Sequence, residues 1–173
     1  MSEEANTLEP WLRGLRRHPD PVTAHLLRAA EQIREDARRA LSELTPGQIW
    51  ARPLGVTSAG FHAKHLAGST RRLCAYLEGR QLTDGELAES AGEAEGTEDG
   101  AVLTAAIDRA LEHYAALVTG LATGEFGSVR EVGRRRIQTT AVSLAIHIAE
   151  HGQRHTGQLV SAARLTVAAS RHD

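Results

Sequence analysis

The chain is short of several residue types, and each shortage excludes a class of protein. Its 173 residues include a single cysteine, Cys74, so neither an internal disulfide nor a cysteine-based zinc cluster can form. Only six residues are aromatic, whereas alanine and leucine make up over a quarter of the chain. Because alanine and leucine favour helices and aromatic residues favour strands, this composition argues against a β-sandwich or a β-barrel.

Charge and hydropathy restrict the expected partners and location. The sequence has 20 basic and 22 acidic residues, so it lacks the basic excess that nucleic-acid binding needs. No run approaches the roughly 18 apolar residues of a membrane-spanning helix. The acidic, polar start Met1-Ser2-Glu3-Glu4 lacks the apolar core of a signal peptide. We therefore expect a cytoplasmic protein with no nucleic-acid partner and no membrane partner.

Apolar residues recur at helical spacing in four stretches. They predict four amphipathic helices, at about 21–44, 58–79, 99–121 and 139–165. Asp20-Pro21 and Ser58 are residue types that begin helices. Residues 79–100 are rich in Gly, Glu, Asp and Ser and predict a long mobile connection, and residues 122–138 predict a second long connection. No convincing strand pattern is present. The fold class predicted is all-α, a four-helix bundle with long connections between helices 2 and 3 and between helices 3 and 4.

The chain is expected to form one domain. A partly ordered N-terminal segment covers residues 1–19, the four-helix bundle covers residues 20–166, and residues 167–173 form a frayed tail. Within the bundle, residues 45–57 are expected to be a loop, with Trp50 packed beneath it.

Five of the nine histidines gather in two short windows of the sequence. On a helical wheel of residues 139–165, His151 and His155 lie one turn apart in the middle of the apolar face. Imidazoles at positions i and i+4 project side by side, which suits two ligands of one metal ion. The alternative is a pair of core or interface histidines that are hydrogen-bonded to backbone or water.

A third ligand has to come from another helix. His65 lies at the edge of the apolar face of the second helix, and His62 is also plausible by its angle, so the wheel does not choose between them. Three neutral imidazoles with one open position are typical of a catalytic metal site. A zinc-protease helix needs Glu directly after the first His, and here that position is Gly152. Glu150 falls on another face, and no obvious carboxylate base is visible near these histidines.

Several other residues have plainer expected roles. Gly157 is expected to permit close helix packing, and Cys74 to be a packed or exposed thiol that binds no metal. Arg72 and Tyr76 are expected to pack or to face solvent, and Arg134-Arg135-Arg136 to form a solvated turn.

Three stretches together resemble the DinB/YfiT-like superfamily. Residues 151–158, HGQRHTGQ, are similar to its His-x-x-x-His-x-Gly-Gln signature. Residues 58–68, SAGFHAKHLAG, resemble its second helix, which carries the first ligand histidine. Residues 44–50, LTPGQIW, resemble its connection between the first two helices. The resemblance covers roughly residues 20–165, with the parts in the family's order.

The resemblance implies a divalent metal ion, zinc or nickel with zinc preferred, inside a four-helix bundle. Carried over position by position, its ligands are His65, His151 and His155. Residues that could form hydrogen bonds to these ligands without binding the metal are His62, His147 and Gln158.

The resemblance also implies two reaction classes. One is metal-dependent hydrolysis, and the other is S-transfer of a low-molecular-weight thiol, such as bacillithiol or mycothiol, to a small-molecule electrophile. The reacting group would be metal-bound water or thiolate, and the protein would be a homodimer. The alternative function is that of a non-catalytic, metal-binding, stress-responsive dimeric protein.

Overall fold

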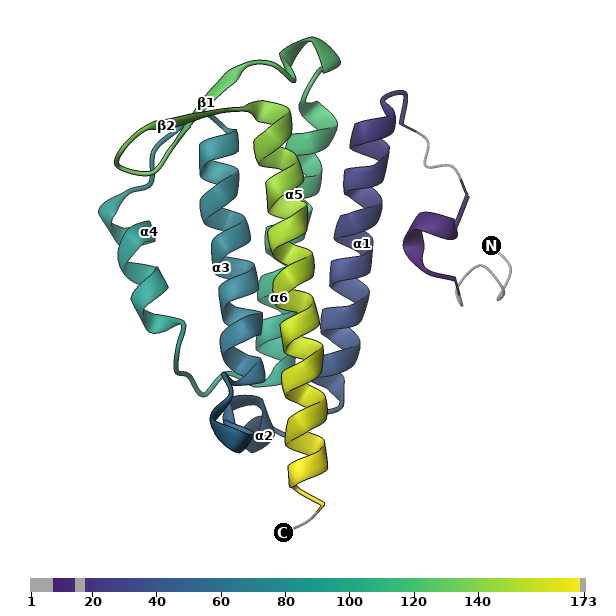
Figure 1. The fold of residues 1–173 in the computed structure, drawn as a ribbon, viewed down its shortest axis with the longest axis vertical. Helices are drawn as coiled ribbons and strands as arrows, with labels where there is room; N and C mark the ends of the chain where they lie inside the picture. The colour runs from purple at the N-terminus through teal and green to yellow at the C-terminus, as the bar shows by residue number, and fades with distance from the viewer. Residues whose placement is uncertain (1–7, 15–17, 172–173) are drawn as a thin grey trace.

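The computed structural model describes residues 8–14 and 18–171, and within them the structure is mostly helical. Four long helices run side by side (Figure 1): α1 (Pro21–Ser42), α3 (Ala59–Leu77), α5 (Gly100–Gly120) and α6 (Ala141–Ala169). No described helix combines the length and the apolar character needed to cross a membrane. Residues 1–7 and 15–17 of the expected N-terminal segment, and residues 172–173 of the expected tail, lie outside the described residues.

Each long helix begins at a side chain that accepts a hydrogen bond from a free backbone N–H of the first turn. Asp20 accepts from the N–H of Thr23 and precedes Pro21, and Ser58 accepts from the N–H of Phe61, which confirms both predicted helix starts. Asp99 and Thr140 do the same for α5 and α6. Local chemistry therefore sets where the four helices begin.

The helices are not packed in the order of the chain. Both α1 and α3 pack against α5 and α6, and α6 lies between α1 and α3 in Figure 1. Their shared core includes the fully buried Ile33, Leu66, Tyr114 and Leu159. The Tyr114 hydroxyl donates a hydrogen bond of 2.9 Å to the carbonyl of Ala145. This arrangement puts α3, with its histidines, directly beside α6.

The glycine that permits close packing of α6 is Gly152, and the expectation for Gly157 was wrong. A Cβ atom on Gly152 would lie 2.7 Å from Cδ1 of Ile33 on α1, which is too close for carbon atoms. A Cβ atom on Gly157 would meet nothing within 4 Å. Gly157 is exposed, so no neighbouring helix packs against it.

The connections hold more structure than expected. Residues 45–57 contain α2 (Pro46–Trp50) and the 3₁₀ turn η3 (Pro53–Gly55). A capping box formed by Thr45 and Gln48 begins α2. The connection after α3 contains α4 (Asp84–Glu89) and the 3₁₀ turn η4 (Ser90–Gly92).

The last part of the connection after α3 is fastened to α2 and α3. Its backbone carbonyls accept hydrogen bonds from Arg52 (to Ala94), Lys64 (to Glu95) and Trp50 (to Glu98), at 2.9, 3.1 and 2.9 Å. A half-buried Trp50 matches its expected packing beneath a loop. The expected mobile connection is therefore an ordered strap, whose far end these three side chains hold in place.

A small sheet follows α5 and corrects the expectation that no strands form. After the 3₁₀ turn η5 (Thr123–Glu125), β1 (Val129–Val132) pairs antiparallel with β2 (Ile137–Thr140), with Val129 opposite Thr140. The hairpin turn holds the exposed Arg134-Arg135-Arg136, as expected. Arg130 Nε donates a 2.6 Å hydrogen bond to the Leu77 carbonyl, which ties the hairpin to the end of α3.

The last helix continues past the expected end at Leu165 to Ala169. Thr166 is buried, and Ser170 donates a hydrogen bond to its carbonyl. Gln48 of α2 in turn bonds to Ser170 at 3.2 Å. Contact with α2 therefore supports a turn that the sequence pattern alone suggested would fray.

Candidate metal centre

The three histidines singled out in the sequence come together between α3 and α6. One ligand nitrogen from each of His65, His151 and His155 can be chosen so that all three lie within 4.8 Å of one another. The ring centroids are 4.4 Å apart for His65 and His155, 4.6 Å for His151 and His155, and 5.4 Å for His65 and His151. All three side chains are half-buried, so the cluster is partly accessible to solvent.

A partner behind each ring engages its Nδ1 atom. His65 Nδ1 lies 2.7 Å from Glu93 Oε2, His151 Nδ1 lies 3.4 Å from Ser69 Oγ, and His155 Nδ1 lies 3.4 Å from Nδ1 of His62. Among the described residues, Nε2 of each ring has no hydrogen-bond partner. Metal-binding histidines characteristically use one ring nitrogen for the metal and the other for a hydrogen bond, so the donor set fits a three-histidine metal ion.

Electrostatics favours the neutral, metal-binding form of these rings. Burial, together with the neighbouring His65, lowers the pKa of both His151 and His155 to about 4. Burial is also the main reason why the pKa of His62 is lowered. Neutral imidazoles have a free lone pair for a cation, and they leave the charge of a bound divalent ion uncancelled.

Glu93 is the candidate-site residue that sequence reasoning missed, since the sequence pattern showed no obvious carboxylate base near the histidines. Its side chain is 5% exposed, and its second oxygen, Oε1, accepts a 2.7 Å bond from Arg72 Nη1. Burial alone would raise the pKa of Glu93, but the hydrogen bonds from His65 and Arg72 outweigh it and lower this pKa. An ionised carboxylate can only accept, so His65 must carry a proton on Nδ1, and in the neutral ring this leaves the lone pair on Nε2.

A glycine makes room for this carboxylate. A Cβ atom on Gly68, one turn after Lys64 on α3, would overlap Oε1 of Glu93 and lie 2.9 Å from Arg72 Nη1. Arg72 thus has a defined partner in place of the packing or solvent role expected for it. The strap carries Glu93 into this space, 28 residues after His65, where no local sequence pattern could pair the two.

The remaining predicted residues differ in their distance from the cluster. His62 is 8% exposed and contacts His155, whereas Gln158 is exposed. His147 is exposed, with its ring centroid 5.8 Å from that of His151 and its Nδ1 atom 4.0 Å from Glu150. The ring of Phe61 stacks on His65, with 5.4 Å between centroids and 15° between planes. Of the three residues expected to support the ligands, only His62 touches a ligand's ring nitrogen among the described residues.

The chain matches a known family over most of its length. No match to the chain was found among curated proteins. Comparison with known families matches residues 29–159 to the DinB superfamily. The matched region runs from the first long helix to the turn after His155, and it therefore contains every residue of the candidate centre. Together, the match over most of the chain and the three-histidine cluster show that the protein belongs to the DinB superfamily.

Proposed function

We propose that this protein is a divalent-metal enzyme that transfers a low-molecular-weight thiol, of the bacillithiol or mycothiol type, to a small electrophile. In this proposal the four long helices act as the family's four-helix bundle, and the protein works in the cytoplasm as a homodimer. His65, His151 and His155 would hold the metal, with zinc preferred over nickel. The observation that carries the proposal is the cluster of three half-buried imidazoles, one ring nitrogen of each within 4.8 Å of the others, and a described partner at each Nδ1 atom.

A divalent cation held by three neutral imidazoles keeps its charge and lowers the pKa of a water or thiol that reaches its open side. The protein's own residues prepare that position. Glu93 holds the Nδ1 proton of His65 and fixes the orientation of the ring, and Arg72 keeps Glu93 ionised. Phe61 covers one face of His65 and limits the approach of water from that side.

The state of Glu93 favours thiol transfer over hydrolysis. Hydrolysis has to activate water, whose pKa a bound metal must lower from about 15.7, and it benefits from a free carboxylate as general base. Both oxygens of Glu93 are engaged, by His65 and by Arg72, so this carboxylate is not free to take a proton from water. A thiol, with a pKa of about 8.5, needs far less activation and no such base.

Metal content is the first test of this proposal. Protein expressed natively should contain about one divalent ion per chain, and His155→Ala should lose most of it. His113→Ala is a matched control, because His113 is a half-buried histidine of α5 that pairs with Glu78 at 2.8 Å and is not part of the three-histidine cluster. Equal metal content in the wild type and in His155→Ala would overturn the three-histidine site.

The reaction class is tested by product analysis. A chlorinated or epoxide electrophile is incubated with the metal-loaded protein and with bacillithiol, mycothiol or glutathione in turn. Thiol transfer predicts a thioether product, with one thiol consumed for each leaving group released or ring opened. A hydroxylated product formed without thiol would identify a hydrolase. A metal-loaded protein that forms neither product would favour a non-catalytic, metal-binding, stress-responsive role.

A further inference from the structure

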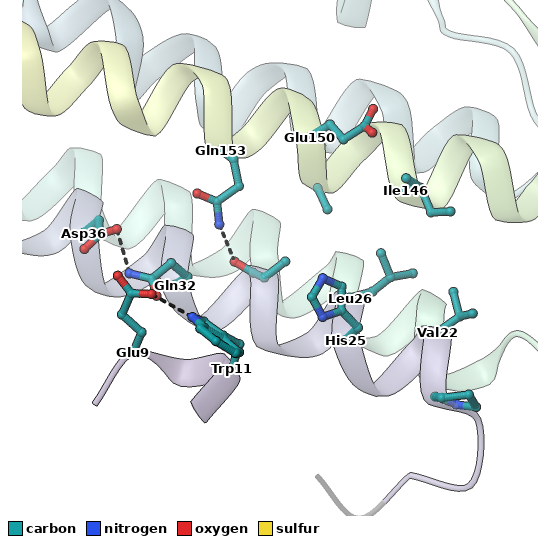
Figure 2. A pocket seen from close by; sticks show the side chains of 13 residues that line it. Glu9, Trp11, Val22, His25, Leu26, Gln32, Asp36, Ile146, Glu150 and Gln153 are labelled. Atoms are coloured by element: carbon teal, nitrogen blue, oxygen red, sulfur yellow. Dashed lines mark hydrogen bonds between the residues drawn. The ribbon is translucent and has the colours of Figure 1, made fainter. Parts of the chain in front are cut away.

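A groove separate from the metal centre runs between α1 and α6 (Figure 2). It has a volume of about 1040 Å³, and none of the three clustered histidines lines it. Glu9 and Trp11, from the segment before α1, border one side. A groove of this size is in the range of small-molecule binding sites.

One end of the groove presents hydrogen-bond acceptors and negative charge. Figure 2 shows Glu9, Gln32 and Asp36 together at this end, beside the ring of Trp11. Trp11 Nε1 donates to Glu9 at 2.7 Å, and Gln32 Nε2 donates to Asp36 at 2.7 Å. Gln32 Oε1 is buried and has no hydrogen-bond partner among the described residues. This end therefore has a buried acceptor in need of a donor.

The other end of the groove is apolar. Figure 2 places Val22 and Ile146 across from each other at this end, and Leu26 lies beside them. Ile146 is 38% exposed although it faces the groove, whereas Leu26 is buried. The groove thus offers an apolar surface at a distance from its acidic end.

The charge of the lining is one-sided. Three carboxylates, from Glu9, Asp36 and Glu150, line the groove together with the imidazole of His25, and no lysine or arginine lines it among the residues that the structure describes. The ion pairs of Asp36 with Arg39 and of Glu150 with His147 are 3.9 and 4.0 Å long, at the outer limit of such contacts. A ligand here meets negative charge that nearby residues compensate only weakly.

We propose that this groove binds a hydrophobic organic cation that carries N–H donors, such as an alkyl- or arylalkylammonium ion. Its ammonium group would donate to Glu9 and Asp36, with the Trp11 ring beside the charge. Its apolar part would cover Val22, Leu26 and Ile146. A second copy of the chain fits less well, because a dimer interface over this groove would have to remove its three carboxylates from water, which costs free energy.

Three probes of equal chain length test this proposal by calorimetric titration. They are n-octylammonium, n-octanol and n-octanoate, which are cationic, neutral and anionic at pH 7. Octylammonium should bind about tenfold more tightly than octanol, as two ion pairs in a partly exposed site would give, and octanoate should bind most weakly. Added salt should weaken only the binding of octylammonium. Equal binding of the three probes, or no binding of octylammonium, would overturn the proposal.

Two variants locate the binding. Asp36→Asn should weaken octylammonium binding by roughly two- to fivefold and leave octanol binding unchanged. Glu112→Gln is the matched control, since Glu112 is an exposed carboxylate on α5 that does not line the groove. Equal effects of the two variants would refute the assignment. Dissociation of a dimer by octylammonium would also refute the assignment, because it would show that a second chain occupies the groove. His155→Ala should bind octylammonium normally, which separates this site from the metal centre.

Discussion

Replacing Glu93 with glutamine should weaken metal binding without unfolding the protein. The carboxylate is 5% exposed and accepts two charge-assisted hydrogen bonds of 2.7 Å, from His65 and from Arg72. An amide of the same shape has one oxygen and one NH₂ group, so only one of the two donors keeps an acceptor. The His65 ring then loses either its fixed tautomer or its fixed orientation.

The expected size of the effect follows from this position behind a ligand. Loss of a hydrogen-bond partner of a metal-binding histidine typically lowers metal affinity by about 10- to 100-fold. That range corresponds to about 1.4 to 2.8 kcal/mol of binding free energy. Glu93→Gln should therefore raise the dissociation constant for zinc, and in parallel for nickel, by one to two powers of ten.

Competition between the metal-free protein and a chromophoric chelator measures this dissociation constant. Glu95→Gln is the matched control, because Glu95 lies two residues along the same strap and its side chain is exposed. Thermal unfolding of the metal-free proteins checks that both variants are folded. Affinities of the two variants within about twofold of each other would refute the role of Glu93.

Gly68→Ala approaches the same contact without removing a polar group. Its Cβ atom would overlap the Glu93 carboxylate and push it away from His65. Metal affinity should fall in this variant as well, although alanine favours a helix more than glycine does. Unchanged affinity together with raised helix stability would show that Glu93 need not lie where the structure places it.

The other predictions concern packing, thiol reactivity and pH. Gly152→Ala should lower the free energy of unfolding by about 1–3 kcal/mol, because its Cβ atom would overpack the core. Gly157→Ala should raise the free energy of unfolding by up to about 1 kcal/mol, because its Cβ atom would lie in open space and alanine favours a helix. Denaturant titration measures both changes. Cys74 is buried with its pKa raised to about 12, so a thiol reagent at pH 8 should modify it only after unfolding, and rapid labelling of the native protein would contradict this. His151 and His155 have a folded-state pKa of about 4, below the unfolded value of about 6.5. The unfolded chain therefore binds protons more readily, and the metal-free protein should lose stability as the pH falls from about 6.5 to 4 and stay level just above 6.5.

The hairpin shows where periodicity is too weak to predict structure. Its strands are four residues long, and Val129 and Ile137, whose apolar side chains would signal a buried face, are 59% and 60% exposed. The two strands therefore show no clear alternation between buried and exposed residues from which a sheet could be predicted. The pairing depends on Arg130 reaching the end of α3 and on the turn at Gly133, which has a φ of +72°.

Glu93 shows the same limit at the candidate metal centre. A metal-binding imidazole calls for a partner on its other nitrogen, so some acceptor behind His65 could be expected from chemistry alone. Which acceptor fills that place depends on Trp50, Lys64 and Arg52, which fasten the strap that carries Glu93. These contacts join residues more than 30 positions apart, and no spacing rule connects them.

The sequence by itself determined the features that depend on neighbours along the chain. Helix starts at Asp20 and Ser58 need only a side chain and the next turn, and His151 and His155 share a face because the helical repeat fixes it. The tertiary structure alone decided which helix lies against which, and with it the convergence of His65 on that pair, the partner of His65 and the glycine that touches α1. Those outcomes require contacts between segments that are distant in sequence. Such contacts depend on how the whole chain buries its apolar surfaces, which no short stretch of sequence specifies.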